Sequence, residues 1–348
     1  MIEPNLQNIP NDYEIQTMDH PSAHSSASAP NSSFDDNLFS PEKPKPSDEN
    51  DKSSTTTTTM SLRHAFVAFE GGVLLAVDYS QLELRIIAHL ADDAVLLDIL
   101  NGEGDVFRSI AGSWLHVAPA DVPDEKRTWA KRVCYGMIYG IGAHSLAQQL
   151  GINEEEAAQF MNSFLDNYQG LKRFLSQTLV EARKDGFVTT LAGRKRFLAD
   201  IADSNPHKKS HAERQAVNTR VQGSAADLVK RAMINVEKRL EEEFPECRTP
   251  HRGAPEDLEA RTKRLTGKEE LGTTKALTKR RSLPPRGAYL VLQLHDELIY
   301  EVNVGDLQRV ARIIKTEMEN AWPGLKVKFP VKLKTAKSWS AMKDLDLG

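Results

Sequence analysis

The sequence lacks the features that would assign it at once to several classes of protein. Its 348 residues include only two cysteines, Cys134 and Cys247, too few for a disulfide framework or a cysteine-based zinc site. No apolar run approaches the roughly 20 residues of a membrane-spanning helix, and the N-terminus lacks the basic-then-apolar layout of a signal peptide. We therefore expect no membrane partner and a reducing, intracellular compartment.

The sequence also lacks a strong excess of charge. Its formal net charge is −4 at pH 7, with 40% hydrophobic and 27% charged residues, which is typical of a globular protein with a sizeable core. This balance neither supports nor excludes nucleic-acid binding, because an enzyme can gather its basic residues on one face. The length suggests two lobes.

Two stretches have few apolar residues. Residues 20–60 consist mainly of Ser, Thr, Pro, Asp and Lys and include five consecutive threonines, while residues 246–286 are basic and poor in aromatics. Neither stretch can bury enough apolar surface to offset the entropy cost of ordering. We interpret both as disordered insertions.

The segment around Asp78 is the first with a chemical signal. The residues before Asp78 are small or apolar and predict a buried strand, and Ser80 suits the N-cap of a following helix. A carboxylate at such a junction lies at an exposed rim, where Mg²⁺ finds oxygen ligands and room for water and phosphates. An aspartate there is also a common helix cap, so this segment alone leaves both interpretations open.

A predicted helix near residue 130 carries the second signal. Arg127, Lys131, Tyr135 and Tyr139 recur every four residues, which places them along one helix face. Two cations followed by two aromatic rings suit a nucleoside triphosphate, because cations bind the phosphates and a ring stacks on the base. An amphipathic helix with snorkelling cations and core tyrosines gives the same pattern, so the alternative stays open.

A predicted hairpin carries the third signal. Apolar strands at 289–294 and 298–302 flank His295, Asp296 and Glu297. Two adjacent carboxylates at the tip repel each other unless a positive charge is near, and a metal ion meets that need.

Other patterns predict the remaining elements. Residues 62–67 predict a strand, residues 154–185 a pair of helices, and residues 305–320 and 327–333 a closing helix and strand. Residues 210–244 predict one long helix. Its polar face carries Arg214, Asn218 and Gln222, whose amides suit a DNA minor groove; ordinary solvation is the alternative.

Together these segments resemble family A DNA polymerases. Residues 78–85 resemble motif A, residues 127–140 resemble motif B of the fingers helix, and residues 295–297 resemble motif C. Residues 4–10 and 214–227 are similar to the palm and primer-binding segments. Within the family, the sequence most resembles the eukaryotic theta branch, with the related nu branch as the nearest rival. This resemblance is carried by residues 62–67 and 105–110 and by the positions of both insertions.

The resemblance implies an α+β fold: a palm built on an antiparallel sheet with helices, plus helical fingers. It divides the chain into a segment leading into the palm (1–19), a disordered insertion (20–60), palm with motif A (61–100), fingers with motif B (101–209) and palm with motif C (210–348), the last interrupted by 246–286. The thumb and the exonuclease-like domain are expected to be missing from this chain.

The resemblance also implies roles for individual residues. Two Mg²⁺ ions would be held by Asp78, Asp296 and Tyr79, with Glu297 as a nearby catalytic carboxylate and Lys131 as a proton donor to pyrophosphate. The residues expected to bind the nucleotide are Arg127, Lys131, Tyr135, Tyr139, Glu83 and Gln81. The residues expected to bind DNA are Arg214, Asn218, Gln222 and His295.

The implied function is template-directed addition of deoxynucleotides to a primer 3′-hydroxyl. The expected partners are primer-template DNA, deoxynucleoside triphosphates and the rest of a longer polymerase chain, and the expected location is the nucleus. The theta branch implies double-strand-break end joining and translesion synthesis. The alternative is a truncated, catalytically silent DNA-binding module, because the thumb is expected to be absent.

Overall fold

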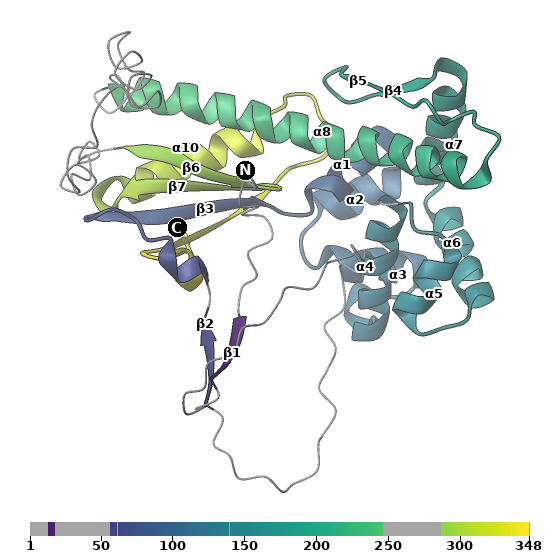
Figure 1. The fold of residues 1–348 in the computed structure, drawn as a ribbon, viewed down its shortest axis with the longest axis horizontal. Helices are drawn as coiled ribbons and strands as arrows, with labels where there is room; N and C mark the ends of the chain where they lie inside the picture. The colour runs from purple at the N-terminus through teal and green to yellow at the C-terminus, as the bar shows by residue number, and fades with distance from the viewer. Residues whose placement is uncertain (1–12, 18–55, 61, 139, 246–286, 348) are drawn as a thin grey trace, which may run out of the picture.

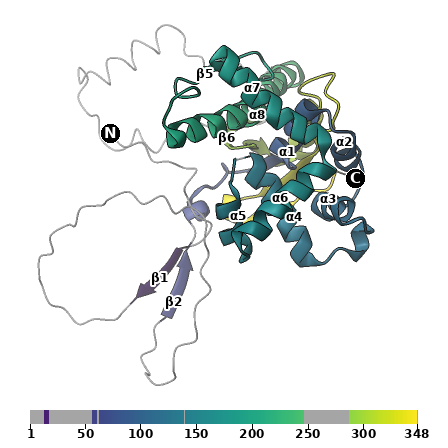
Figure 2. The ribbon, with the colours of Figure 1, turned by 90° about the vertical axis from the view of Figure 1, so that its right-hand side faces the viewer.

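The computed structural model describes residues 13–17, 56–60, 62–138, 140–245 and 287–347 (Figures 1 and 2). The predictions for Tyr139, for residues 4–10 and for the insertion 246–286 fall outside these residues. Within the other predicted insertion, residues 56–60 form a strand, β2 (Thr56–Met60), which pairs antiparallel with β1 (Tyr13–Thr17). The prediction of disorder is therefore wrong for residues 56–60. Their β-branched threonines suit an extended backbone.

A five-stranded antiparallel sheet forms one half of the molecule, in the order β6-β7-β3-β8-β9. The strands are β3 (Gly72–Tyr79), β6 (Ala288–Leu294), β7 (Glu297–Asn303), β8 (Val331–Ala336) and β9 (Lys343–Asp344). Two helices, α8 (Pro206–Glu243) and α10 (Leu307–Glu319), cover one face (Figure 1).

The central strand β3 is apolar along most of its length because both of its faces are covered. Leu75 and Val77 belong to the large core shared with the helices, whereas Leu74 and Ala76 belong to a smaller cluster around Trp339 on the opposite face. A strand buried on two sides shows a continuous apolar run instead of alternation. The predicted buried strand before Asp78 is therefore confirmed.

The other half is helical and lies beyond the end of β3 that carries Asp78 (Figures 1 and 2). Its helices are α1 (Leu82–Ala91), α2 (Ala94–Asn101), α3 (Val106–Leu115), α4 (Asp124–Ile138), α5 (Ala143–Leu150), α6 (Glu154–Asn167) and α7 (Gln169–Asp185). A short hairpin of β4 (Phe187–Thr189) and β5 (Lys195–Phe197) contacts α7 and α8. One hydrophobic cluster runs through both halves and fixes them together.

The α+β prediction is confirmed. The predicted helix pair at 154–185, the long helix at 210–244 and the hairpin of strands 289–294 and 298–302 are also confirmed. The strand predicted at 62–67 is wrong. A 3-10 helix, η2 (Leu62–Ala65), stands there, and Val67 makes only an isolated bridge to Ser338. The Phe66 ring packs edge-on against Trp339, and the Phe66 carbonyl accepts from the Trp339 backbone N–H at 3.0 Å, so single contacts hold this segment in place of a strand ladder.

Candidate active site

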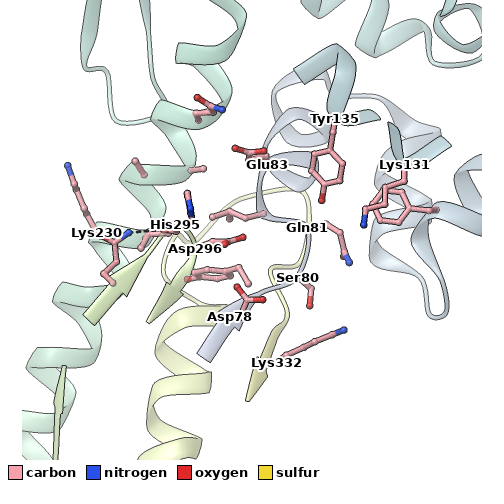
Figure 3. Close-up of a pocket in the computed structure, with 18 residues that line it drawn as sticks. Asp78, Ser80, Gln81, Glu83, Lys131, Tyr135, Lys230, His295, Asp296 and Lys332 are labelled. Atoms are coloured by element: carbon pink, nitrogen blue, oxygen red, sulfur yellow. Dashed lines mark hydrogen bonds between the residues drawn. The ribbon is translucent and has the colours of Figure 1, made fainter. Parts of the chain in front are cut away.

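A cavity of about 890 Å³ opens where the sheet meets the helices. The end of β3, the tip of the β6–β7 hairpin, α4 and α8 surround it (Figure 3). The residues singled out in the sequence that line it are Asp78, Tyr79, Gln81, Glu83, Lys131, Tyr135, Gln222, His295 and Asp296. Segments far apart in the chain therefore contribute to a single site.

Asp78 and Asp296 come together because the sheet register forces them to. Asp78 is the ladder partner of Glu297 at the start of β7, so it lies beside the hairpin tip. The Tyr79 backbone N–H donates to the Asp296 carbonyl at 3.4 Å, and the two aspartate carboxyl groups are close enough to hydrogen-bond each other. Figure 3 shows both side chains at the floor of the cavity.

The electrostatics of this pair suit a bound cation. Burial, followed by the neighbouring Asp296 and Glu297, raises the pKa of Asp78 to about 7. Burial also raises the pKa of Asp296 above its ordinary value. Two half-buried carboxylates resist ionising together because their negative charges repel each other. A bound divalent cation would offset this repulsion.

The described residues contain no group of three or more His, Cys, Asp or Glu side chains arranged to hold a metal. Mg²⁺ does not require one, because it is commonly held by one or two carboxylates with waters and substrate phosphates as the other ligands. The pair Asp78 and Asp296 fits this pattern. The Tyr79 hydroxyl donates to the Met318 carbonyl at 2.7 Å, so only the main chain of Tyr79 is left to serve as a ligand.

Glu297 lies to one side of the cavity. It lines a neighbouring cavity of about 210 Å³ that it shares with Arg63, Asp78 and Asp296. Burial raises the pKa of Glu297, while the nearby positive charge of Arg63 opposes that rise. The carboxyl group is therefore adjacent to the acid pair without entering the main cavity.

A residue with strained backbone lies close to each aspartate in the chain, after Asp78 and before Asp296. Gln81, at the N-cap of α1, has φ of 51°, and His295, before Asp296, has φ of 50°. Residues other than glycine adopt this left-handed region at a cost, and such strain is common at functional sites. The predicted cap Ser80 is wrong: Gln81 occupies the N-cap position and no side chain caps the helix.

Arg85 holds the first of these turns. Its side chain is buried, and it donates from Nε to the Ser80 carbonyl at 2.9 Å and from Nη1 to the carbonyls of Leu100 and Lys328 at 2.6 and 2.9 Å. Arg85 was not among the functional residues predicted from the sequence. The signal was an arginine on a helix face that is otherwise apolar, where a buried cation needs several acceptors.

The face of α4 supplies a cation and a phenol. Lys131 Nζ lies 6.0 Å from the Phe107 ring centroid, and the Tyr135 ring lies 6.0 Å from the same ring. Burial and then the facing Glu83 raise the pKa of Tyr135 to about 12, so the hydroxyl keeps its proton at neutral pH. Figure 3 shows Glu83 and Tyr135 on the same side of the cavity, with Lys131 near its edge.

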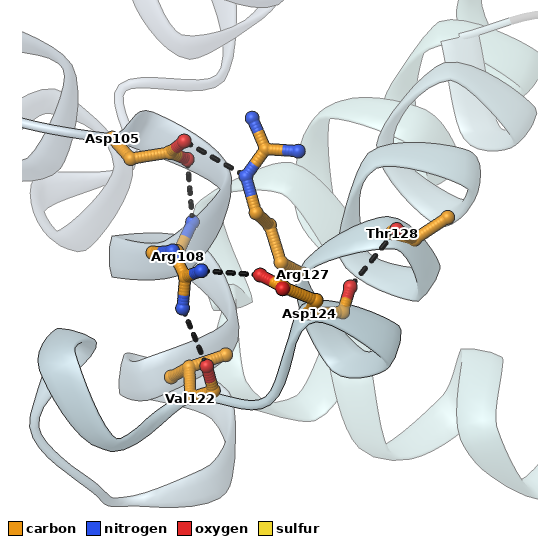
Figure 4. A network of polar contacts seen from close by, with 6 residues as sticks. All are labelled: Asp105, Arg108, Val122, Asp124, Arg127 and Thr128. Carbon is orange, nitrogen blue, oxygen red and sulfur yellow. Dashed lines mark hydrogen bonds and ion pairs between the residues drawn. The ribbon is translucent and has the colours of Figure 1, made fainter.

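Arg127 does not line the cavity. Its Nε donates to Asp105 Oδ2 at 2.8 Å, one helical turn before Lys131 (Figure 4). The prediction placed both cations of this face at the nucleotide. Helical spacing brings the two Cβ atoms onto one face, but it does not decide which acceptor the long arginine side chain reaches.

The residues predicted to bind DNA follow α8. Gln222 lines both the main cavity and a second cavity of about 350 Å³ between α8 and the β4–β5 hairpin, to which Asn218 also belongs. That second cavity is basic: Arg194, Lys195 and Arg196 line it. Arg214 lines neither cavity. Its Nη1 donates to Ser210 Oγ at 2.8 Å.

Gly140 lets α8 approach the end of α4. Its φ is +68°, and a Cβ added there would lie 2.6 Å from Arg214 Cγ. Glycine suits this position because it tolerates the positive φ and leaves room for the Arg214 side chain.

Three polar residues of the cavity were missed: Gln293, Lys230 and Lys332. Lys332 is the ladder partner of Asp78 on β8, and its charge lowers the pKa of that aspartate. The alternation around Lys332 was visible in the sequence, but the sheet register that turns it to Asp78 was not. Lys230 continues the four-residue spacing of Gln222 along α8, and that signal was available.

None of the described helices combines the length and apolar composition that crossing a bilayer requires. The model of the family described as DNA polymerase family A matches residues 1–341. DNA polymerase theta of Mus musculus is 44% identical over 353 residues, covering 99% of this chain, and DNA polymerase theta of Drosophila melanogaster is 32% identical over 348 residues, covering all of it. The chain spans 14% of the length of each of these relatives.

DNA polymerase I of Bacillus subtilis is 33% identical over 80% of this chain and 27% of its own length. Among solved structures, the POL domain of Pol1 from M. smegmatis, in complex with DNA primer-template and dNTP, is 34% identical with a TM-score of 0.64, covering 80% of this chain and 42% of that one. The theta-like resemblance is thereby confirmed. The chain belongs to DNA polymerase family A.

Proposed function

We propose that this chain carries the catalytic centre of a template-directed DNA polymerase. The observation that supports it most directly is the convergence of Asp78 and Asp296 beneath a helix that bears Lys131 and Tyr135. The solved relative was captured with primer-template and dNTP, which makes the same ligands reasonable for this cavity. The substrates would be a deoxynucleoside triphosphate and a primer 3′-hydroxyl.

Asp78, Asp296 and the Tyr79 main chain would hold two Mg²⁺ ions. When bound, the ions would supply activation of the attacking hydroxyl and neutralisation of charge on the leaving pyrophosphate. Glu297 would support the pair from the adjacent cavity. Lys332 adds positive charge on the other side of Asp78, beside the space for the phosphates.

The helix α4 would bind the nucleotide. Lys131 lies at the edge of the cavity, where it would contact the phosphates and would donate a proton to leaving pyrophosphate. Glu83 lies beside Tyr135 on the same side of the cavity, and its bulk would exclude a ribose 2′-hydroxyl. Gln81 also lines the cavity and would contact the nucleotide near its sugar and phosphates.

The DNA would follow α8 away from the acids. His295 and Gln222 are at the cavity wall, Asn218 and Arg196 come next in the basic cavity, and Arg214 lies further toward the start of α8. Arg194 of this cavity is paired with Asp227, and the other cations and amides suit a phosphate backbone and the acceptors of a minor groove. We propose that primer and template lie along this path.

Similarity to DNA polymerase theta suggests a cellular role for this chain. An enzyme of this branch would act in end joining and translesion synthesis within the nucleus, with the rest of a longer polymerase chain as its partner. The chain spans only 14% of the theta relatives, so a catalytically silent DNA-binding module is the competing function.

Primer extension separates the two. The wild-type chain and Asp78→Asn are assayed with a fluorescent primer-template, four dNTPs and Mg²⁺, and DNA affinity is measured by anisotropy under the same conditions. We expect extension by the wild type alone, with equal DNA affinity for both proteins. A folded wild type that binds DNA without extending it would select the silent module.

A further inference from the structure

A polar network joins α3 to the first turn of α4 (Figure 4). Asp105 Oδ1 accepts from the Arg108 backbone N–H at 2.9 Å, as the N-cap of α3, while Asp105 Oδ2 accepts from Arg127 Nε at 2.8 Å. Arg108 pairs with Asp124 and donates to the Val122 carbonyl at 2.6 Å. One carboxylate therefore fixes both the start of α3 and the direction of the Arg127 side chain.

Stability is a weak reason for this ion pair. The side chains of Arg127 and Asp105 are 35% and 34% exposed, and ion pairs at such exposure contribute little to folding. Arg127 also lies in the first turn of α4, where the helix dipole disfavours a cation and favours an anion. Folding stability therefore does not explain a cation at this position, whereas the binding of an anionic ligand does.

The pair leaves the working end of the guanidinium accessible. Among the described residues, Arg127 makes its side-chain hydrogen bond through Nε, and Figure 4 shows the two terminal nitrogens directed away from Asp105. Lys131, which lines the cavity, follows one turn later, roughly 6 Å along the helix axis. The helix that Asp105 caps also brings Phe107 to the cavity wall beside Lys131.

We propose that Asp105 is a positioning residue for nucleotide binding. By holding Nε, it presents the terminal nitrogens of Arg127 to the phosphate end of a triphosphate bound beside Lys131. Arginine is rotamer-rich, and fixing it before binding removes part of the entropy cost of immobilising it in the complex. This inference rests on the proposed function, because it takes a nucleoside triphosphate as the ligand.

Charge repulsion and positioning predict opposite effects of removing Asp105 on triphosphate affinity. Asp105 is negative, so on charge alone its removal strengthens the binding of an anionic triphosphate. If Asp105 positions Arg127, its removal weakens binding. Asp105→Asn is the informative variant, because asparagine caps a helix as well as aspartate does and removes only the charged partner of Arg127.

The experiment measures KM and kcat for one dNTP, and the Kd of a fluorescent dNTP with primer-template bound, in a set of variants. We expect Asp105→Asn to raise KM and Kd roughly three- to tenfold with kcat nearly unchanged. Asp124→Asn is the matched control, because it removes the same charge from the same network without touching Arg127. Its KM and Kd should stay at the wild-type values.

A double-mutant comparison completes the test. In an Arg127→Ala background, Asp105→Asn should add no further loss, because the side chain that it positions is gone. An unchanged or lower Kd in Asp105→Asn, an equal rise in Asp124→Asn, or a rise that persists without Arg127 would overturn the proposal. A wild type that binds the nucleotide without extending primers contradicts the proposed function, while the Kd series still decides the role of Asp105.

Discussion

The two sides of the cavity are built by different means. On the sheet side, Asp78 and Asp296 are placed by backbone: ladder pairing between β3 and β7 and a two-residue hairpin tip. On the helix side, Lys131 and Arg127 stand one turn apart on α4, yet only Lys131 reaches the cavity. The acids are fixed by short side chains on a rigid frame, whereas the cations depend on long side chains and their partners.

This difference suggests a division of labour. A reaction that requires two metal ions needs carboxylates placed with little freedom, and a sheet supplies that. Phosphate binding tolerates movement of the long cationic side chains, because the bound phosphates themselves complete the hydrogen bonds and ion pairs. We therefore expect substitutions on the sheet side to abolish chemistry. Substitutions on the helix side should have smaller effects, on kcat at Lys131 and on nucleotide affinity or choice at the other positions.

The largest effect is expected from Asp296→Asn. Losing one of two shared carboxylates removes several kcal/mol of transition-state stabilisation, so kcat for primer extension should fall by at least about a thousandfold. Glu297→Gln is the matched comparison and should lose much less activity, because Glu297 is adjacent in the chain but would support the acid pair only from outside the main cavity. Equal losses in the two variants would remove the distinction between the cavities.

Lys131→Ala should come next, with kcat reduced by about a hundredfold, because a cation at the phosphates and a proton donor are lost together. Lys131→Arg keeps the charge but not the ready proton, and should recover nucleotide affinity more than kcat. Single-turnover kinetics at saturating dNTP separates the two quantities. Full activity in Lys131→Ala would show that the helix side does not take part in chemistry.

Tyr135→Phe tests the phenol of α4. We expect the Tyr135 hydroxyl to stand in for the missing 3′-hydroxyl of a dideoxynucleotide, so the variant should discriminate against chain terminators roughly three- to tenfold more strongly, the worth of one hydrogen bond. Incorporation of ordinary dNTPs should stay near the wild-type rate. Terminator incorporation that does not change would contradict this role.

The smallest effect concerns stability. The folded-state pKa of Asp78 is raised from 3.8 to about 7, so its ionisation opposes folding, and stability falls as pH rises through this window. At pH 8 in EDTA, Asp78→Asn should therefore melt roughly 2–4 °C above the wild type. Adding Mg²⁺ should raise the Tm of the wild type and leave the variant almost unchanged. A lower Tm for the variant in EDTA would contradict this account of the acid pair.

The sheet side was largely predictable from sequence. The apolar run before Asp78 and the hairpin around Asp296 each have a local pattern, and both strands form where they were expected. What the sequence lacked was register: Lys332 faces Asp78 only because β8 pairs with β3 in one alignment. Register depends on contacts between distant segments, which no local pattern encodes.

The helix side was predictable at the level of the backbone and not of the side chains. The four-residue spacing correctly gave one helix face, and Lys131 and Tyr135 reach the cavity. Arg127 turns to Asp105 instead, because the N-cap of a neighbouring helix offers it a carboxylate. Arg85 was missed for a related reason: its acceptors at Leu100 and Lys328 come from segments brought together only by folding.

The central claim is that Asp78 and Asp296 share a pair of divalent cations. The most direct test counts Mn²⁺ ions by electron paramagnetic resonance in the complex with primer-template and a non-hydrolysable dNTP, which needs no catalysis. We predict two ions in the wild type, close enough for spin–spin coupling, and loss of that coupled pair in both Asp78→Asn and Asp296→Asn. A coupled pair that survives either substitution, or a wild-type complex without one, would contradict the account.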